Sequence, residues 1–234
     1  MSRIAIIGHG NVGSHLFEAL SPLAETVAVS ASSGEPFPED CGIYIIAVPD
    51  DHIRETASRI KRRGSIIVHT SGSTPMPVLG MDGPRGVIYP LQTFTKGVAT
   101  DMAAVPFFLE ASDKETLDKL RKLVSLISSN IYEADSGTRK KLHIAAVLAC
   151  NFTCRLWSIA DAMMRESGAD FQALAPLIKE TFRKAQAISP REAQTGPARR
   201  HDEGTISSHL ELLSNDASLH EIYRLLSDNI SENY

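Results

Sequence analysis

Short apolar runs alternate with amphipathic segments over the first half of the chain. The runs at residues 4–7, 26–29, 43–48, 65–69, 86–89 and 106–110 contain many β-branched and aromatic residues and predict buried strands. Residues 11–20, 50–62 and 112–129 carry the apolar spacing or the start signals of helices. Strands that alternate with helices predict a doubly wound parallel sheet of the α/β class.

The pattern changes after residue 133. Residues 137–166 contain no proline and no internal glycine, and as one helix they would be about 45 Å long. The stretch 142–152 is apolar almost all round, which predicts a helix buried on most sides. Further helices are predicted at residues 170–188, 203–214 and 218–231, without another strand pattern. We therefore predict an α/β domain at residues 1–133 and an all-helical domain at residues 134–234.

Three glycines stand where the first apolar run meets the first helix. Gly8, Gly10 and Gly13 have the spacing G-x-G-x-x-G. In a dinucleotide cradle the first glycine permits the tight turn, the second lets a pyrophosphate approach, and the third lets the helix pack closely. A turn that only needs glycine φ angles would leave the spacing of three glycines to chance. We therefore predict a Rossmann-type cradle whose cofactor-binding residues are Gly8, His9, Gly10, Asn11, Val12 and Gly13, with backbone amides facing the phosphates.

The end of the second predicted strand bears on the choice of cofactor. NAD-binding proteins usually place an acidic residue about 20 residues past the glycines, where it binds the ribose 2′-hydroxyl. This chain has Ser30-Ala31-Ser32-Ser33 instead. The missing carboxylate removes a repulsion against a 2′-phosphate, and the hydroxyls of Ser30 and Ser32 can donate to one. No arginine adjoins them, and plain loop serines are the alternative explanation. The sequence favours NADP, with NAD as the alternative.

Other candidate residues follow the carboxyl ends of later strands, where the ligand crevice of an open α/β sheet lies. Ala47, Val48, Pro49 and Thr70 are expected to flank the nicotinamide or its ribose. Ser71 and Gln92 are expected to face the substrate, although small hydroxyls at such places also serve as ordinary turn residues.

Two polar residues interrupt the apolar part of the long helix. His143 and Asn151 are eight residues apart, which separates them by ~80° and ~12 Å on an α-helix. They could line one wall, but they could not both touch one small reacting group. Spacing alone favours a hydrogen-bonded core histidine, and the alternative is a general acid that works near neutral pH.

Composition narrows the class of protein. The chain has 234 residues, a formal net charge of −4, 43% apolar and 22% charged residues, which is ordinary for a soluble globular protein. There is no electrostatic case for a nucleic-acid or membrane partner. No apolar run approaches the ~20 residues of a membrane span, and the first residues lack the pattern of a signal peptide. The three cysteines form no C-x-x-C pair and no metal site is predicted, so we expect a cytoplasmic protein.

Several motifs carry a resemblance to known families. Residues 7–13 together with Ala47-Val-Pro-Asp50 resemble the superfamily of 6-phosphogluconate dehydrogenases, β-hydroxyacid dehydrogenases and pyrroline-5-carboxylate reductases. More narrowly, residues 69–73 with 89–94, residues 142–152 and residues 194–200 resemble a family of Rossmann-like oxidoreductases with a helical C-terminal domain of unknown function. The resemblance spans essentially the whole chain.

This resemblance implies a dinucleotide-binding Rossmann domain at 1–133 and a 6-phosphogluconate-dehydrogenase-like helical domain at 134–234. The resemblance also implies that the substrate binds in a cleft between the two domains, and that the protein forms a homodimer through its helical domain. The β-hydroxyacid dehydrogenases place a catalytic lysine four residues before an asparagine on the long helix. Here Lys140 and Lys141 are followed at that spacing by Ile144 and Ala145, which counts against ordinary 3-hydroxyacid oxidation.

The loop at residues 189–202 contains two adjacent arginines that could hold a carboxylate or a phosphate. Spacing alone favours a solvated loop in which Asp202 caps the next helix. The resemblance instead favours a loop that faces a ligand or an interface, with Thr195, Gly196 and Arg199 as candidates. The narrower family generally has Gly-Asp after the arginines, whereas this chain has His201-Asp202, so the loop is expected to differ locally.

Together these observations predict an NADP-dependent oxidoreductase that moves a hydride between nicotinamide and a small C=O or C=N substrate. His143 is the candidate proton donor, and Ser71, Gln92 and Asn151 are candidates for positioning the substrate. Two alternatives stay open. One is a non-catalytic NAD(P)-binding sensor or regulatory protein, and the other is an enzyme with a further electron partner such as a deazaflavin.

Overall fold

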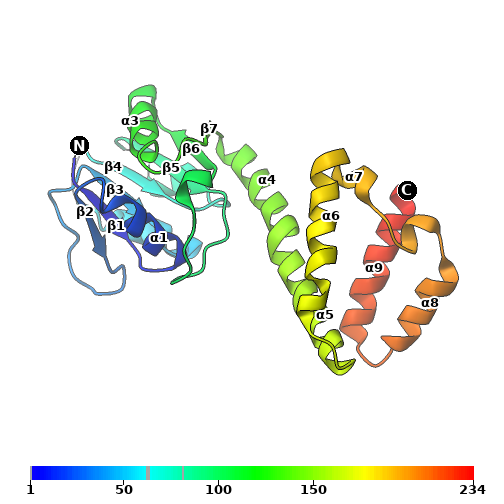
Figure 1. Ribbon diagram of the computed structural model, residues 1–234. Coiled ribbons are helices and arrows are strands. Elements are labelled where there is room, and N and C mark those ends of the chain that lie inside the picture. Colours follow the sequence, from blue (N-terminus) through cyan, green and yellow to red (C-terminus); the bar gives the residue numbers. More distant parts are fainter. Residues whose placement is uncertain (1, 62–63, 81) are drawn as a thin grey trace. The chain divides into compact units, whose positions relative to one another are not determined.

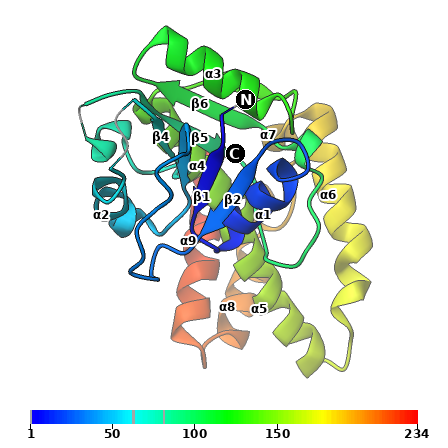
Figure 2. The same cartoon turned by 90° about the vertical axis from the view of Figure 1, so that its left-hand side faces the viewer.

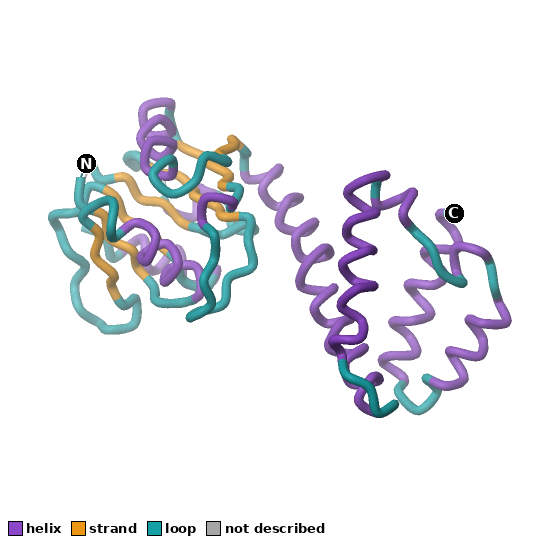
Figure 3. The backbone as a smooth tube through the Cα atoms, in the orientation of Figure 1, coloured by secondary structure: helices purple, strands orange, loops and turns teal. Residues whose placement is uncertain are grey.

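The computed structural model describes residues 2–61, 64–80 and 82–234, and it forms two compact units. The first unit extends to Trp157 and the second runs from Ser158 to Tyr234. Strands occur only before Ser136 in the described part of the chain, and helices and loops make up the rest (Figures 1 and 3). The units divide later in the chain than the predicted boundary at 133/134, because the first unit includes the helix after the last strand, whose Arg139 pairs with Glu110 of the sheet.

The sheet has seven strands in the order β2-β1-β3-β4-β5-β6-β7 among the described residues. Their bounds are β1 Ile4–Ile7, β2 Thr26–Val29, β3 Ile43–Ile46, β4 Ile66–His69, β5 Arg85–Pro90, β6 Phe107–Ala111 and β7 Ile131–Glu133. Neighbouring strands pair in parallel, as predicted, except that β6 runs antiparallel to β5. A loop with one 3₁₀ turn, Met102–Ala104, joins β5 to β6, and an antiparallel pair needs no crossover helix. The sequence pattern did not predict β7.

Helices cover both faces of this sheet (Figure 2). Alternate residues of β1 point to opposite layers, so Ile4 and Ile6 pack with α1 (Asn11–Leu20) and α3 (Lys114–Val124). Ala5 and Ile7 pack in the other layer with α2 (Ile53–Ser58). Both layers bury β1 completely, which is why this strand is a continuous apolar run.

The predicted helix at 50–62 is shorter than expected. Asp50–His52 form a 3₁₀ turn, α2 ends at Ser58, and the predicted end at residue 62 lies outside the described residues. A second 3₁₀ turn, Met76–Leu79, follows β4. Helix α3 begins after Asp113, whose carboxylate accepts a hydrogen bond of 2.8 Å from the amide of Thr116.

The rest of the described chain is helical. Helix α4 (Ser136–Ala146), a π-helical turn (Val147–Phe152) and α5 (Thr153–Glu166) form one continuous helix. The later elements are a 3₁₀ turn at Phe171–Leu174, α6 Ala175–Ile188, α7 Pro190–Ala193, a 3₁₀ turn at Ala198–Arg200, α8 Glu203–Leu212 and α9 Ala217–Asn233. Asp202 caps α8 by accepting a hydrogen bond of 3.1 Å from the amide of Thr205.

The long helix is more exposed than the sequence predicts. Ile144, Leu148 and Phe152 are each more than half exposed, so the expectation of burial on most sides of residues 142–152 is wrong for the single chain. Ser136–Glu166 is the one helix in the described residues that is long and apolar enough to cross a membrane. That result rests on length and composition alone, and an apolar helix of a soluble protein passes the same test.

Candidate active site

A cavity of about 1270 Å³ lies in the first unit, along the carboxyl ends of β1, β3, β4 and β5 and against α4 and the π turn. It brings together most of the candidate residues from the sequence. These are Gly8, His9, Gly10, Asn11, Val12, Ser30, Ser32, Ala47, Val48, Pro49, Thr70, Ser71, Gln92, His143 and Asn151. Gly13 packs beneath the cavity instead of lining it. Thr195, Gly196 and Arg199 belong to the second unit, and their role stays a prediction.

The three glycines fit a dinucleotide in three different ways. A Cβ on Gly8, whose φ is +117°, would lie 2.3 Å from the carbonyl oxygen of Ala47. A Cβ on Gly13 would lie 2.1 Å from the carbonyl oxygen of Gly8, so both positions need glycine for the turn and the helix packing. A Cβ on Gly10 would meet no atom within 4 Å, which leaves the backbone open to the cavity.

Helix α1 begins at this open backbone. Gly10 is its N-cap, no described side chain caps it, and its first turn contains no acidic residue. The amides at the start of α1 are therefore available to an anion, and the helix dipole favours negative charge there. The residues present fit the pyrophosphate of a dinucleotide.

The fold brings an arginine to the serines after β2, which the sequence did not indicate. Arg59 follows α2, and its guanidinium donates to the carbonyl oxygens of Ala31 (2.5 Å) and Glu35 (3.2 Å). It also lies 4.4 Å from the ring centre of Phe37. Ser30, Ser32 and Arg59 line the same cavity. Only the spatial proximity of β2 and α2 reveals this group, because the arginine is far from the serines in sequence.

Ser71 uses its hydroxyl inside the turn after β4. Its Oγ donates to Asp50 Oδ2 (2.9 Å) and accepts from the amides of Ser73 (3.1 Å) and Thr74 (2.9 Å). These contacts are the turn chemistry that the sequence offered as the alternative. A role of Ser71 in positioning the substrate stays a prediction.

Gln92 lines the cavity after β5, and its Oε1 accepts from the amide of Thr93 (2.8 Å). The side-chain amide nitrogen hydrogen-bonds to no described group and can serve as a donor. This arrangement is compatible with a contact to a substrate, which stays a prediction.

Tyr89 and His143 both line the cavity and contact each other. The Tyr89 hydroxyl lies 3.2 Å from Nδ1 of His143, and the two rings meet edge to face with centroids 6.1 Å apart. Tyr89 is 7% exposed, and burial raises the pKa of its hydroxyl, while the positive charge of Arg139 opposes this increase. Sequence reasoning missed Tyr89, although its place at the carboxyl end of β5 was the signal that could have found it.

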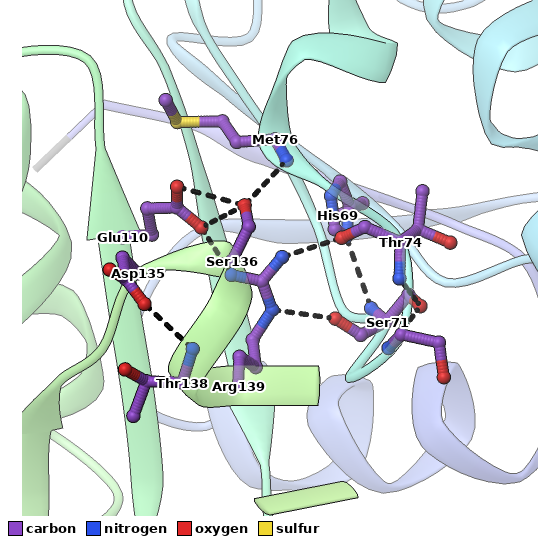
Figure 4. A network of polar contacts seen from close by, with 10 residues as sticks. His69, Ser71, Thr74, Met76, Glu110, Asp135, Ser136, Thr138 and Arg139 are labelled. Carbon is purple, nitrogen blue, oxygen red and sulfur yellow. Dashed lines mark hydrogen bonds and ion pairs between the residues drawn. The ribbon is translucent and has the colours of Figure 1, made fainter. Parts of the chain in front are cut away.

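Arg139 lies one helical turn before His143 and is fully buried. Figure 4 shows its polar contacts. It forms an ion pair with Glu110 of β6 and donates to the carbonyl oxygens of Ser71 (3.1 Å) and Thr74 (2.5 Å). Ser136 donates to the same carboxylate at 2.9 Å. This network fixes the start of α4 to the sheet and to the turn after β4, and sequence reasoning did not identify it.

His69, the last residue of β4, lies behind the same turn. Its Nδ1 accepts from the amide of Ser71 (3.1 Å), and its side chain is completely buried. Burial, and then the charge of Arg139, lower the pKa of His69 to about 4. His69 therefore supports the turn as a neutral imidazole.

The π turn changes the expected relation of His143 and Asn151. A π turn adds one residue to an α-helix, so eight residues act like seven α-helical steps and separate the two side chains by ~20° instead of ~80°. The estimate from a straight α-helix is corrected accordingly. Both residues line the cavity. No group of three or more His, Cys, Asp or Glu residues that could hold a metal occurs in the part of the chain that the structure describes.

The sheet, the glycine cradle and the helical remainder define a Rossmann-type dinucleotide-binding protein with a helical C-terminal domain. The chain belongs to the family described as a domain of unknown function (DUF2520), whose model matches residues 105–230. A Bacteroides fragilis protein provisionally assigned as an NADP oxidoreductase is similar to it, with 35% identity, 99% of this chain and 98% of that chain covered, and a TM-score of 0.90.

Two more distant structures share the fold. A Thermotoga maritima protein is 20% identical, with 98% of this chain and 97% of that chain covered and a TM-score of 0.73. An imine reductase from Myxococcus stipitatus in complex with NADP⁺ is 15% identical, with 98% and 92% covered and a TM-score of 0.61. No curated protein matches the chain.

Proposed function

We propose that this protein is an oxidoreductase that uses NADP, with NAD as the alternative, to reduce or oxidise a small C=O or C=N substrate. The observation that carries the proposal is the open, uncapped start of α1 in the same cavity as His143. The 35% identical Bacteroides fragilis protein, provisionally assigned as an NADP oxidoreductase, supports it. When bound, the nicotinamide supplies or accepts the hydride.

The chain's own residues would hold the two ends of this cofactor. The amides of Asn11 and Val12 would bind the pyrophosphate beside Gly10. The hydroxyls of Ser30 and Ser32 and the guanidinium of Arg59 would bind a 2′-phosphate. The end of β2 carries no carboxylate that would repel it, which favours NADP. Ala47, Val48, Pro49 and Thr70 would flank the nicotinamide half, as the sequence predicts.

His143 would exchange a proton with the substrate. Its Nδ1 lies against Tyr89, and no described group hydrogen-bonds to Nε2, so Nε2 is the atom that can give a proton to the substrate oxygen or nitrogen. Gln92 and Asn151 would orient the substrate by neutral hydrogen bonds. The lysine of the β-hydroxyacid dehydrogenases is absent at the matching spacing, so the proton must come from another group.

A thermal-shift measurement with NADPH and NADH tests the cofactor assignment. A ligand at a hundred times its Kd stabilises the native state by about 2.7 kcal/mol. The Gly10→Ala variant should keep the melting temperature of the free protein, because its Cβ meets no atom within 4 Å, and it should lose the shift with NADPH.

The matched control is Gly137→Ala in α4, where the added Cβ would lie 3.6 Å from a carboxylate oxygen of Asp135. This variant should keep the full shift. A wild-type protein without a shift for either dinucleotide would overturn the cofactor assignment. Binding without turnover of keto acids or cyclic imines would favour the non-catalytic sensor.

We also propose that the protein is a cytoplasmic homodimer assembled through its helical domain. Within the second unit, Leu177, Phe182 and Leu212 are 64%, 65% and 77% exposed. Large exposed apolar patches often mark protein–protein contacts, and these three side chains are the candidates for such a contact. Light scattering after size exclusion should give twice the mass of 25.4 kDa, and Phe182→Asp should give the monomer. A wild-type monomer that binds lipid vesicles would contradict the proposal.

A further inference from the structure

The contact between Tyr89 and His143 joins two separate elements of the fold, β5 and α4. Tyr89 stands at the carboxyl end of β5, and His143 lies in the last turn of α4. Arg139, one turn earlier on the same helix face, holds α4 by its ion pair with Glu110 and its hydrogen bonds to the turn after β4. With α4 held in this way, Nδ1 of His143 lies 3.2 Å from the hydroxyl of Tyr89.

Gly72 leaves just enough room for this contact. A Cβ at position 72 would lie 2.7 Å from Cζ of Tyr89 and 2.9 Å from Nδ1 of His143. Any side chain there would push against both partners of the hydrogen bond. Position 72 requires glycine because neighbouring side chains come so close, and not because of its backbone angles.

A tyrosine hydroxyl suits a group that changes its protonation state. It can donate to Nδ1 of a neutral imidazole, and it can accept from Nδ1–H of an imidazolium. Burial raises the pKa of Tyr89, which keeps its proton in place near neutral pH. A carboxylate at this position would favour the imidazolium, and a phenyl ring would leave Nδ1 without a partner.

We propose that Tyr89 is the positioning residue of His143. Its hydroxyl, which lies beside Gly72, hydrogen-bonds to Nδ1 in both protonation states of the imidazole. Nε2 then stays directed toward the cavity, where it can exchange a proton with a substrate. The catalytic meaning of this pair rests on the proposed function. The hydrogen bond itself does not, because it involves only residues of this chain.

Nitrogen-15 NMR of the histidine side chains in the full-length protein without cofactor tests the hydrogen bond. His143 can be assigned from the signals that disappear in His143→Gln. At a pH where the imidazole is neutral, the wild type should show the Nε2–H tautomer with Nδ1 accepting a hydrogen bond. Tyr89→Phe, which removes one oxygen atom, should shift the Nδ1 signal toward that of an unbonded nitrogen.

Tyr132→Phe is the matched control, because Tyr132 is 51% exposed on β7 and its ring stacks on Phe108 instead of contacting His143. It should leave the His143 signals unchanged. Identical His143 signals in Tyr89→Phe and the wild type would overturn the proposal. This result is independent of the proposed function, because no dinucleotide or substrate is added.

Kinetics then test whether the hydrogen bond matters for turnover of a cyclic imine probe with NADPH. Tyr89→Phe should lower kcat roughly tenfold, as expected for the loss of one hydrogen bond, and should leave the KM for NADPH unchanged. In a His143→Gln background the same substitution should have no further effect, because Tyr89 acts through His143. Additive losses in the double variant would overturn the positioning role.

Discussion

Arg139 offers the sharpest test of how the candidate site is held. The residue is fully buried at the start of α4, and its partner Glu110 on β6 is only 16% exposed. Replacement by methionine keeps an unbranched apolar stem of similar length. It leaves the Glu110 carboxylate without its cation and the carbonyl groups of Ser71 and Thr74 without a donor.

The expected cost follows from these lost partners. Removal of one member of a buried ion pair destabilises a protein by about 3–5 kcal/mol, because a buried charge is left uncompensated. The orphaned carbonyl groups contribute to the same loss and cannot simply be added to it. We expect Arg139→Met to lower the free energy of unfolding by about 4 kcal/mol, a large part of the ~5–15 kcal/mol that stabilises a typical protein.

Urea unfolding followed by circular dichroism measures this loss. Arg121→Met is the matched control, because Arg121 pairs with Glu133 near the surface, with side chains 41% and 59% exposed. Such exposed pairs contribute about 1 kcal/mol or less. The double variant Arg139→Met/Glu110→Leu should regain much of the stability, since it removes the orphaned carboxylate. Equal losses in Arg139→Met and Arg121→Met would refute this reasoning.

Three further predictions concern the turn after β4 and the two ends of the cradle. The pKa of His69 is lowered to about 4 by burial and by Arg139, so the unfolded chain takes up the proton first when the pH falls below ~6.5. His69 should therefore lower the free energy of unfolding by roughly 3 kcal/mol between those pH values, and urea unfolding of His69→Gln should show a decrease that is smaller by this amount. Gly13→Ala should fold poorly, because its Cβ would lie 2.1 Å from a carbonyl oxygen, whereas Gly10→Ala should melt like the wild type. Similar melting temperatures for the two alanine variants would contradict the different roles of these glycines. Arg59→Ala should weaken NADPH binding about tenfold or more in calorimetric titration and leave NADH binding nearly unchanged. An equal loss for both dinucleotides would exclude a contact with the 2′-phosphate.

The sequence predicted the parts of the molecule that depend on neighbouring residues. The apolar run of β1 indicates a strand covered on both faces, and Gly8, Gly10 and Gly13 follow it at the spacing of a cradle. Each requirement is local: a turn, an open backbone and a close helix contact. The seven-stranded sheet confirms the predicted fold class. This class could be predicted because alternating strands and helices allow few topologies.

The features that sequence reasoning missed depend on residues far apart in the chain. Arg59 reaches the serines after β2 only because α2 packs beside them. The residues around position 30 give no indication that an arginine lies there. Arg139 looks like one more basic residue on a polar helical turn, yet it is buried against Glu110. The periodicity of apolar residues predicts which face of a helix is buried. It does not predict which charged side chain from another element will pair with a residue on that face. Tyr89 was overlooked for the same reason, because its partner lies on another element.

Helix α4 explains how such distant pairings could form one site. Arg139 and His143 are four residues apart, so they share a face, and the ion pair that fixes the first also fixes the direction of the second. The π turn then returns Asn151 to nearly that face, which a regular α-helix would have turned away by ~80°. The buried arginine determines how α4 is rotated about its own axis. The π turn determines that Asn151 lies on nearly the same face of the helix as His143. A substitution at Arg139 should therefore disturb the candidate proton donor and Asn151 together.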